Sequence, residues 1–88
     1  MKAKVKKQLD ALGAYYFSPQ SGIYGRSGVP DIIGCLGGKF FAIECKAGSN
    51  TTTGLQDKEL SRIRAAAGLA MVINETNIGE VETCLRNF

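Results

Sequence analysis

Two short apolar segments joined by Gly37-Gly38 constrain the fold of this chain most strongly. A Gly-Gly pair between runs of β-branched and aromatic residues is a strong signal for a β-hairpin. If the two glycines form the turn, Leu36 faces Lys39, and the same register places Asp31 opposite Glu44. Directly opposed residues hold their Cβ atoms about 4.5–5.5 Å apart on one face of a sheet. The sequence therefore predicts two neighbouring carboxylates at the open end of a hairpin.

Strand periodicity adds Lys46 to the same face, because it follows Glu44 by two positions. The opposite face of the second strand suits a core and carries Phe41, Ile43 and Cys45. Facing carboxylates repel each other, so one must be protonated or a cation must lie between them. Mg²⁺ and Mn²⁺ prefer oxygen ligands, and a nearby lysine orients water or stabilises charge on a phosphate. Asp31, Glu44 and Lys46 thus indicate metal-assisted hydrolysis of a phosphodiester.

A structural explanation of these charged residues is also open. Asp31 follows Pro30 and would suit the start of a strand or a turn. Glu44 and Lys46 would suit a solvated face of an edge strand. Two features favour the metal site. Glu44 directly follows the apolar residues 40–43, where burial should continue, and a structural hairpin has no need of opposed acids.

The remaining pattern predicts one α/β domain over residues 1–88, with the order helix, three strands, helix, strand, helix. Apolar residues at helical spacing indicate helices at 2–12, 55–68 and 77–88. Apolar or aromatic runs indicate strands at 14–18, 31–36, 39–46 and 69–73. A threonine at 51–53 is expected to cap the second helix. A helix between the third and fourth strands predicts a right-handed crossover and a mixed sheet.

The side chains expected in the core follow from the same periodicity. In the helices they are Val5, Leu9, Leu12, Leu60, Ile63, Ala67, Ile78, Val81 and Leu85. The aromatic run Tyr15–Phe17 is expected to serve the core and the sheet rather than to stack on nucleic-acid bases.

Composition excludes several classes of site. The chain of 88 residues has no histidine, which excludes Ser-His-Asp and Cys-His catalysis and zinc sites built on histidine. Its three cysteines lack C-x-x-C spacing, so we expect reduced thiols and neither disulfides nor a zinc knuckle. A net charge of +3 permits a nucleic-acid partner without requiring one. With no signal-peptide pattern and no membrane-spanning run, a cytoplasmic protein is expected.

At this point the charged residues match a known pattern. Pro30-Asp31 followed by Glu44-Cys45-Lys46 resembles the PD-(D/E)XK nuclease motif. The segments "GRSGVPDII", "AIECK" and "AAGLAMVI", together with Gln56, resemble the VRR-NUC branch of that superfamily, over roughly residues 1–75. The resemblance implies a restriction-endonuclease-like αβββαβ core with a mixed sheet flanked by helices, plus a C-terminal helix. Small stand-alone members, from phages and bacteria, dimerise and act on branched DNA such as Holliday junctions.

The resemblance also implies a role for each matched residue. Asp31 and Glu44 would bind Mg²⁺ or Mn²⁺, with the backbone carbonyl of Cys45 as the third ligand. Lys46 would position the attacking water. Gln56 would lie at the edge of the site.

Contacts with DNA are expected from one loop and one helix. Glycines in "YGRSG" let backbone amides approach an anion, which would bring Arg26 and Ser27 to a phosphate beside the metal. The lysines of the first helix, above all Lys4 and Lys7, would either rest on the DNA backbone or form a solvated face. Many members of the family carry a further acid on this helix. Here only Asp10 is acidic, which leaves the number of metal ions open.

These inferences predict a magnesium- or manganese-dependent DNA endonuclease that acts on branched DNA as a homodimer. Exposed apolar residues of the last helix and strand are expected to form the contact between protomers. Two other functions stay open: a catalytically inactive nucleic-acid-binding module with the same fold, and a structural protein or inhibitor that uses the hairpin as an interaction edge.

Overall fold

The order of helices and strands agrees with the prediction in a computed structural model that describes residues 1–19 and 27–88. The elements are α1 (Lys2–Leu12), β1 (Tyr15–Phe17), β2 (Ile32–Leu36), β3 (Lys39–Cys45), α2 (Gly54–Ala65), β4 (Leu69–Ile73) and α3 (Glu80–Arg86). The strands form one sheet in the order β1-β2-β3-β4. Neighbours are antiparallel up to β3, and β3 and β4 are parallel, so the predicted mixed sheet is confirmed.

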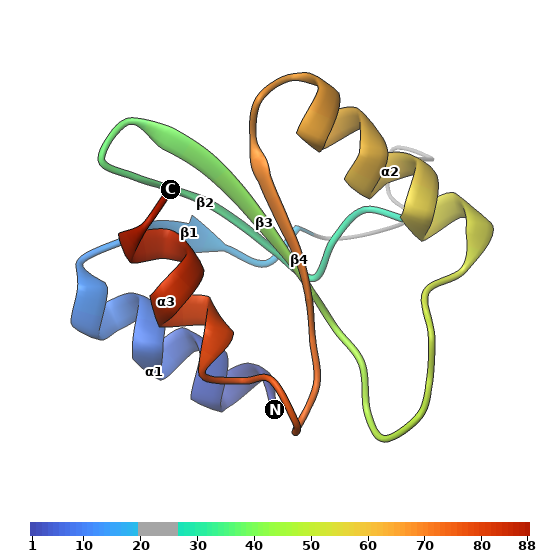
Figure 1. Cartoon of the computed structure of the whole chain (residues 1–88), viewed down its shortest axis with the longest axis horizontal. Helices are drawn as coiled ribbons and strands as arrows, with labels where there is room; N and C mark the ends of the chain where they lie inside the picture. The colour runs from blue at the N-terminus through green and yellow to red at the C-terminus, as the bar shows by residue number, and fades with distance from the viewer. Residues whose placement is uncertain (20–26) are drawn as a thin grey trace.

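The sheet separates two layers of helices (Figure 1). α1 and α3 lie side by side on one face, and α2 lies on the other. The main core fills the space between the sheet and the α1–α3 layer, and its fully buried cluster comprises Val5, Leu9, Ile32, Phe41, Ile43, Met71, Ile73, Val81 and Leu85. Full burial of such a side chain contributes about 1.5–3 kcal/mol, so this face supplies most of the hydrophobic stabilisation.

The hairpin between β2 and β3 has the predicted register. Ile32 pairs with Ile43 and Leu36 pairs with Lys39. Gly37 and Gly38 have φ angles of 61° and 81°, the combination that a two-residue type I′ turn requires. Because both turn residues need positive φ, glycine fixes the loop length and thereby the register of the whole hairpin.

Helix termini explain where the sequence pattern stops being helical. α1 ends at Gly13, which adopts a left-handed conformation with φ of 75°. Thr53 caps α2, as predicted. The expected helix at 55–68 ends early, at Ala65, because the chain turns through Ala67 at φ of 69°, so Ala67 is exposed instead of buried.

The expectations for two groups of apolar side chains hold only in part. Residues Tyr15–Phe17 lie in the sheet as strand β1, and Tyr16 packs against the core cluster, as expected. Tyr15 and Phe17 are 73% and 49% exposed, because β1 is an edge strand whose α2-side face the described residues leave open. In α3, Val81 and Leu85 are buried against the rest of the core. The apolar side of the last helix is therefore not available to a second protomer. Within residues 1–19 and 27–88, no helix has the length and apolarity to cross a membrane.

Candidate functional site

The predicted pair of acids lies at the open end of the hairpin. β2 begins at Ile32, opposite Ile43, so Asp31 and Glu44 occupy the next opposed positions. Asp31 itself lies outside the strand, and its side-chain carboxylate takes the place of a main-chain acceptor for the Cys45 N–H. Asp31 Oδ2 accepts a hydrogen bond from the Cys45 backbone N–H at 2.8 Å. This bond ties the loop before β2 to the end of β3 and holds Asp31 beside Glu44.

Glu44 is a buried acid with an incomplete set of partners. Glu44 is 3% exposed and lies on the face of β3 toward α2, where Gln56 contacts it. Gln56 Nε2 donates to Oε2 at 2.8 Å, and Lys46 Nζ lies 3.4 Å from the same oxygen. Oε1 is buried and has no hydrogen-bond partner among the described residues. Such an atom is costly unless a ligand completes it.

The electrostatics of Glu44 point to a missing positive charge. Burial raises the pKa of Glu44 above 4.5, and the negative charge of Asp31 raises this pKa further. Lys46 lowers the pKa of Glu44 through a hydrogen bond and its charge, but the net shift is still upward. Neutralisation of Glu44 therefore requires a proton or a further cation. The opposed positions of Asp31 and Glu44 in the predicted hairpin lead to the same requirement.

The oxygen atoms gathered here suit a hard divalent cation. Asp31 and Glu44 supply carboxylate oxygens, and Cys45 supplies a backbone carbonyl. In a strand, a residue's N–H and C=O point to the same side, so the Cys45 carbonyl is directed toward the side of Asp31. Residues 1–19 and 27–88 contain no group of three His, Cys, Asp or Glu side chains that could hold a metal. The candidate ligands are thus two carboxylates and one backbone carbonyl, and such oxygen ligands fit Mg²⁺ or Mn²⁺ better than zinc.

The Cys45 thiol is not part of this set. Its side chain belongs to the opposite face of β3, where it packs against the core cluster. Burial and the nearby charge of Asp31 raise the pKa of the thiol, which keeps it protonated and poor as a ligand.

Gln56 reaches the site from the first turn of α2. Thr53 and Gln56 form a capping box: Thr53 Oγ1 accepts from the Gln56 backbone N–H at 3.2 Å, and Gln56 Oε1 accepts from the Thr53 backbone N–H at 2.9 Å. The remaining end of the side-chain amide contacts Glu44. The Thr-x-x-Gln spacing at the start of an amphipathic run is a visible sequence signature of this motif, so Thr53 could have been singled out from the sequence.

Gly28 lets the loop before Asp31 lie directly on α2. It has φ of 80°, and a Cβ at this position would lie 2.6 Å from both the carbonyl carbon and the oxygen of Leu55. Figure 1 shows the segment before β2 running to α2. Close backbone contact at Gly28 therefore sets the distance between the Asp31 loop and the helix turn that carries Gln56.

Sequence reasoning missed the partner of Asp31 on α1. Lys2 Nζ lies 3.4 Å from Asp31 Oδ1, and the Lys2 side chain is largely exposed. Nothing in the local sequence marks this pair, because it depends on how the first turn of α1 packs beside the hairpin. Asp10 lies eight residues further along α1, about 12 Å along the helix axis. It accepts a hydrogen bond from the Tyr16 hydroxyl at 2.7 Å, which directs it to β1 instead of the carboxylate pair.

The structure describes three of the four residues that are predicted to contact DNA. Lys4 and Lys7 are exposed on α1, on the side away from Val5 and Leu9. Ser27 is exposed next to Gly28. Arg26 lies outside the described residues.

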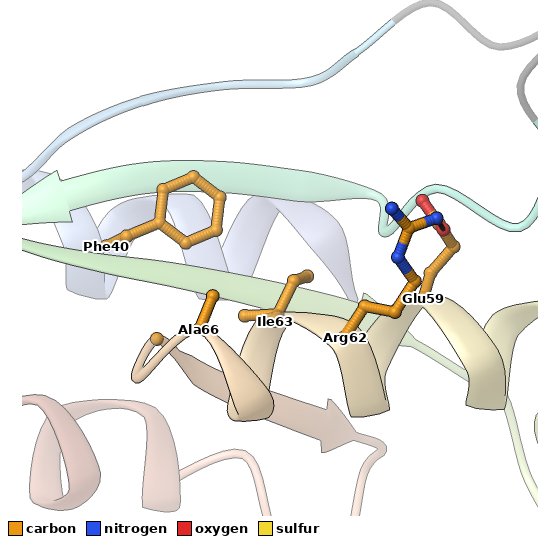
Figure 2. Close-up of a pocket in the computed structure, with 6 residues that line it drawn as sticks. Phe40, Glu59, Arg62, Ile63 and Ala66 are labelled. Atoms are coloured by element: carbon orange, nitrogen blue, oxygen red, sulfur yellow. Dashed lines mark ion pairs between the residues drawn. The ribbon is translucent and has the colours of Figure 1, made fainter.

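A shallow pocket lies along the later turns of α2, away from Gln56, and Asp31 and Glu44 are not among its lining residues. It has a volume of about 290 Å³ and is lined by Phe40, Glu59, Arg62, Ile63, Ala66 and Gly68. In Figure 2, Phe40 of β3 faces Ile63 and Ala66 of α2, with Arg62 and Glu59 further along the helix. A neighbouring pocket shares Phe40 and Ile63 and extends to Pro30, directly before Asp31. An apolar groove thus leads along α2 toward the site.

Comparison with known proteins identifies the fold. No family model matches the sequence, and no curated protein matches it. A solved structure described as a VRR_NUC domain is similar to this chain, with a TM-score of 0.78 and 22% sequence identity. The similarity covers 99% of this chain and 91% of the solved chain, so it includes every element described above. The chain therefore has the fold of a VRR_NUC domain, as the resemblance of its motifs implies.

Proposed function

We propose that residues 1–88 form one nuclease domain that hydrolyses phosphodiester bonds in DNA with the help of Mg²⁺ or Mn²⁺. The observation that carries this proposal is Glu44, a buried acid opposite Asp31 whose Oε1 has no hydrogen-bond partner in the part of the chain that the structure describes. Burying a carboxylate costs several kcal/mol, roughly, unless charge and hydrogen bonds compensate it. A purely structural hairpin gains nothing from that cost, whereas a metal site uses both acids.

Each residue of the site has a chemical task in this proposal. Asp31, Glu44 and the Cys45 carbonyl would hold the cation. A divalent ion bound there would polarise the phosphate and make water more acidic. Lys46, at 3.4 Å from Glu44 Oε2, would orient the attacking water and stabilise negative charge on the phosphate. Gln56 would keep the Glu44 carboxylate in place.

DNA would be recognised through its backbone. Lys4 and Lys7 are exposed on α1, whose first turn reaches Asp31 through Lys2, so phosphates of DNA at the site would lie within reach of this helix. Ser27 and Arg26 would contact the phosphate beside the cation. Such contacts position DNA without reading its sequence, which agrees with an enzyme that selects branched structures such as Holliday junctions.

A homodimer would use the open sheet face instead of α3. The strand register places Tyr15, Phe17 and Phe40 on the face that carries α2, and they are 73%, 49% and 44% exposed. We name these three residues the aromatic face. In this small chain, an aromatic surface of this kind is a candidate for burial against a second copy. Two copies would bring two sites to one branched substrate.

The direct test is a cleavage panel. The protein is incubated with labelled four-way junction, flap and linear duplex DNA in Mg²⁺, Mn²⁺ or EDTA, and binding is measured in parallel. Metal-dependent nicking that is lost in Asp31→Ala and Lys46→Ala, with DNA binding retained, would support the nuclease.

The same panel separates the two alternative functions. Binding without cleavage in any metal would identify a nucleic-acid-binding module with a nuclease-like fold. If the protein neither binds nor cleaves DNA, a structural or inhibitory role remains.

A further inference from the structure

The helix cap of α2 determines how Gln56 meets Glu44. Gln56 is the third residue of α2, and its Oε1 accepts from the Thr53 backbone N–H at 2.9 Å. A glutamine amide has one accepting end and one donating end. Because a backbone N–H can only donate, Thr53 requires the oxygen of the Gln56 amide. The NH₂ end is then the only one left for Glu44, and it lies 2.8 Å from Oε2.

The reversed amide would be unfavourable at both ends. The Thr53 N–H would face the Gln56 NH₂, and the Gln56 oxygen would face a carboxylate oxygen of Glu44. Two donors and two acceptors would then be opposed in a partly buried place, where unpaired polar groups are costly. One amide therefore satisfies the cap and the acid together, and only in one orientation.

The consequence for Glu44 is an asymmetry between its two oxygens. Oε2 accepts a hydrogen bond from Gln56 Nε2 and lies 3.4 Å from Lys46 Nζ. Oε1 is buried and has no partner in the described part of the chain. We propose that Thr53 is a positioning residue: by fixing the Gln56 amide, it directs this donor to Oε2, near which Lys46 also lies, and so leaves Oε1 open to a divalent cation. The last step rests on the proposed function.

Three substitutions at Thr53 separate the cap from the positioning contact. Thr53→Ser keeps both the hydroxyl and the N–H. Thr53→Ala removes the cap oxygen and keeps the N–H. Thr53→Pro removes both, and the Thr53 φ of −82° lies near the proline value, so the backbone conformation is compatible. Ala and Pro therefore lose the same cap oxygen and differ in the N–H that holds Gln56.

The first readout is the side-chain amide of Gln56 in ¹⁵N-labelled protein, assigned with Gln56→Ala. In the wild type, Thr53→Ser and Thr53→Ala, its NH₂ signals should be shifted and protected from exchange. In Thr53→Pro they should move to the values of a solvated glutamine. Identical Gln56 signals in the Ala and Pro variants would overturn the positioning role, and this measurement needs no metal.

The second readout is Mn²⁺ affinity by calorimetry without DNA. Partners that orient a ligand typically change metal affinity about 10–100-fold. Thr53→Pro should bind Mn²⁺ about tenfold more weakly than Thr53→Ala. Both should melt about 4–8 °C below the wild type, because both lose the cap. Equal Mn²⁺ affinities of Thr53→Ala and Thr53→Pro would refute the claim that Thr53 keeps Oε1 of Glu44 open to the cation. A wild-type protein that binds no Mn²⁺ would refute the proposed function, while the amide signals would still decide the positioning of Gln56.

Discussion

Gly28→Ala tests whether the loop that carries Asp31 is built on the backbone of α2. A Cβ at Gly28 would lie 2.6 Å from the Leu55 carbonyl carbon and oxygen and 3.0 Å from the Gln56 nitrogen. These are backbone atoms in the first turn of a helix, so they cannot move aside as a flexible side chain would. Relief of the overlap must therefore displace the loop, the helix turn, or both.

The magnitude follows from comparison with Gly13→Ala. Gly13 has a similar φ, 75° against 80°, but apart from its two chain neighbours no described residue has an atom within 4 Å of its would-be Cβ. Both variants incur the left-handed cost of about 1–2 kcal/mol for alanine. Only Gly28→Ala adds overpacking of about 1–3 kcal/mol. At this chain length that excess corresponds to a difference of about 4–24 °C in melting temperature.

The assay is thermal unfolding of both variants in EDTA, followed by Mn²⁺ calorimetry well below the lower melting temperature. Gly28→Ala should melt lower than Gly13→Ala and should also bind Mn²⁺ more weakly, because Asp31 moves relative to Gln56. Equal melting temperatures for the two variants would refute the close contact between the loop and α2. A lower melting temperature with unchanged Mn²⁺ affinity would show that this contact does not set the geometry of the site.

Three further predictions concern the acid, the DNA contacts and the protomer contact. Glu44→Gln should abolish cleavage yet keep or raise the melting temperature in EDTA, because burial and Asp31 raise the pKa of Glu44 above 4.5 and disfavour its charged form in the folded state. Between pH 4.5 and the raised pKa, the folded wild type binds more protons than the unfolded chain, so the wild type gains stability as pH falls. The difference in stability between Glu44→Gln and the wild type should therefore shrink as pH falls through the raised pKa toward 4.5. A large destabilisation by Glu44→Gln at neutral pH would instead show that Glu44 is structural. Lys4→Ala should make the negative slope of log affinity for DNA against log salt shallower by about 0.9, because one phosphate contact is lost, whereas an unchanged slope would exclude Lys4 from the interface. Phe40→Glu should convert a dimer to a monomer in size-exclusion chromatography with light scattering. Leu55→Glu should not, although Leu55 is more exposed than Phe40 (56% against 44%), because it lies outside the aromatic face. A wild-type monomer at micromolar concentration would count against dimerisation altogether.

The hairpin and its acids were predictable because local chemistry fixes them. Gly37 and Gly38 define a two-residue turn, and the turn defines every opposed pair up to the open end. The position of Glu44 beside Asp31 follows from that register alone. The order of elements followed for a similar reason, since the periodicity of each segment and the glycines between segments are local properties.

What the sequence did not show depends on how the layers cover each other. The aromatic run Tyr15–Phe17 suggested a place in the core and the sheet, but it cannot show how far α2 extends across the sheet, and Tyr15 and Phe17 are exposed. The pair between Lys2 and Asp31 likewise depends on the packing of α1 beside the hairpin. The contact between Gln56 and Glu44 was predictable only in part. The Thr53–Gln56 capping box is visible in the sequence, but the contact of Gln56 with β3 depends on how α2 packs on the sheet.

The site is assembled where elements end, and this explains how the fold tolerates it. Asp31 precedes β2, Glu44 is the penultimate residue of β3, and Gln56 lies in the first turn of α2. The nine residues of the main core lie on the opposite side of the sheet, where each contributes about 1.5–3 kcal/mol. A buried, incompletely paired acid on the α2 side can cost several kcal/mol, roughly, without competing for positions in that core. Substitutions that improve the pairing of Glu44 should therefore stabilise the metal-free protein and weaken its metal site together, because both effects arise from Oε1, which has no partner among residues 1–19 and 27–88.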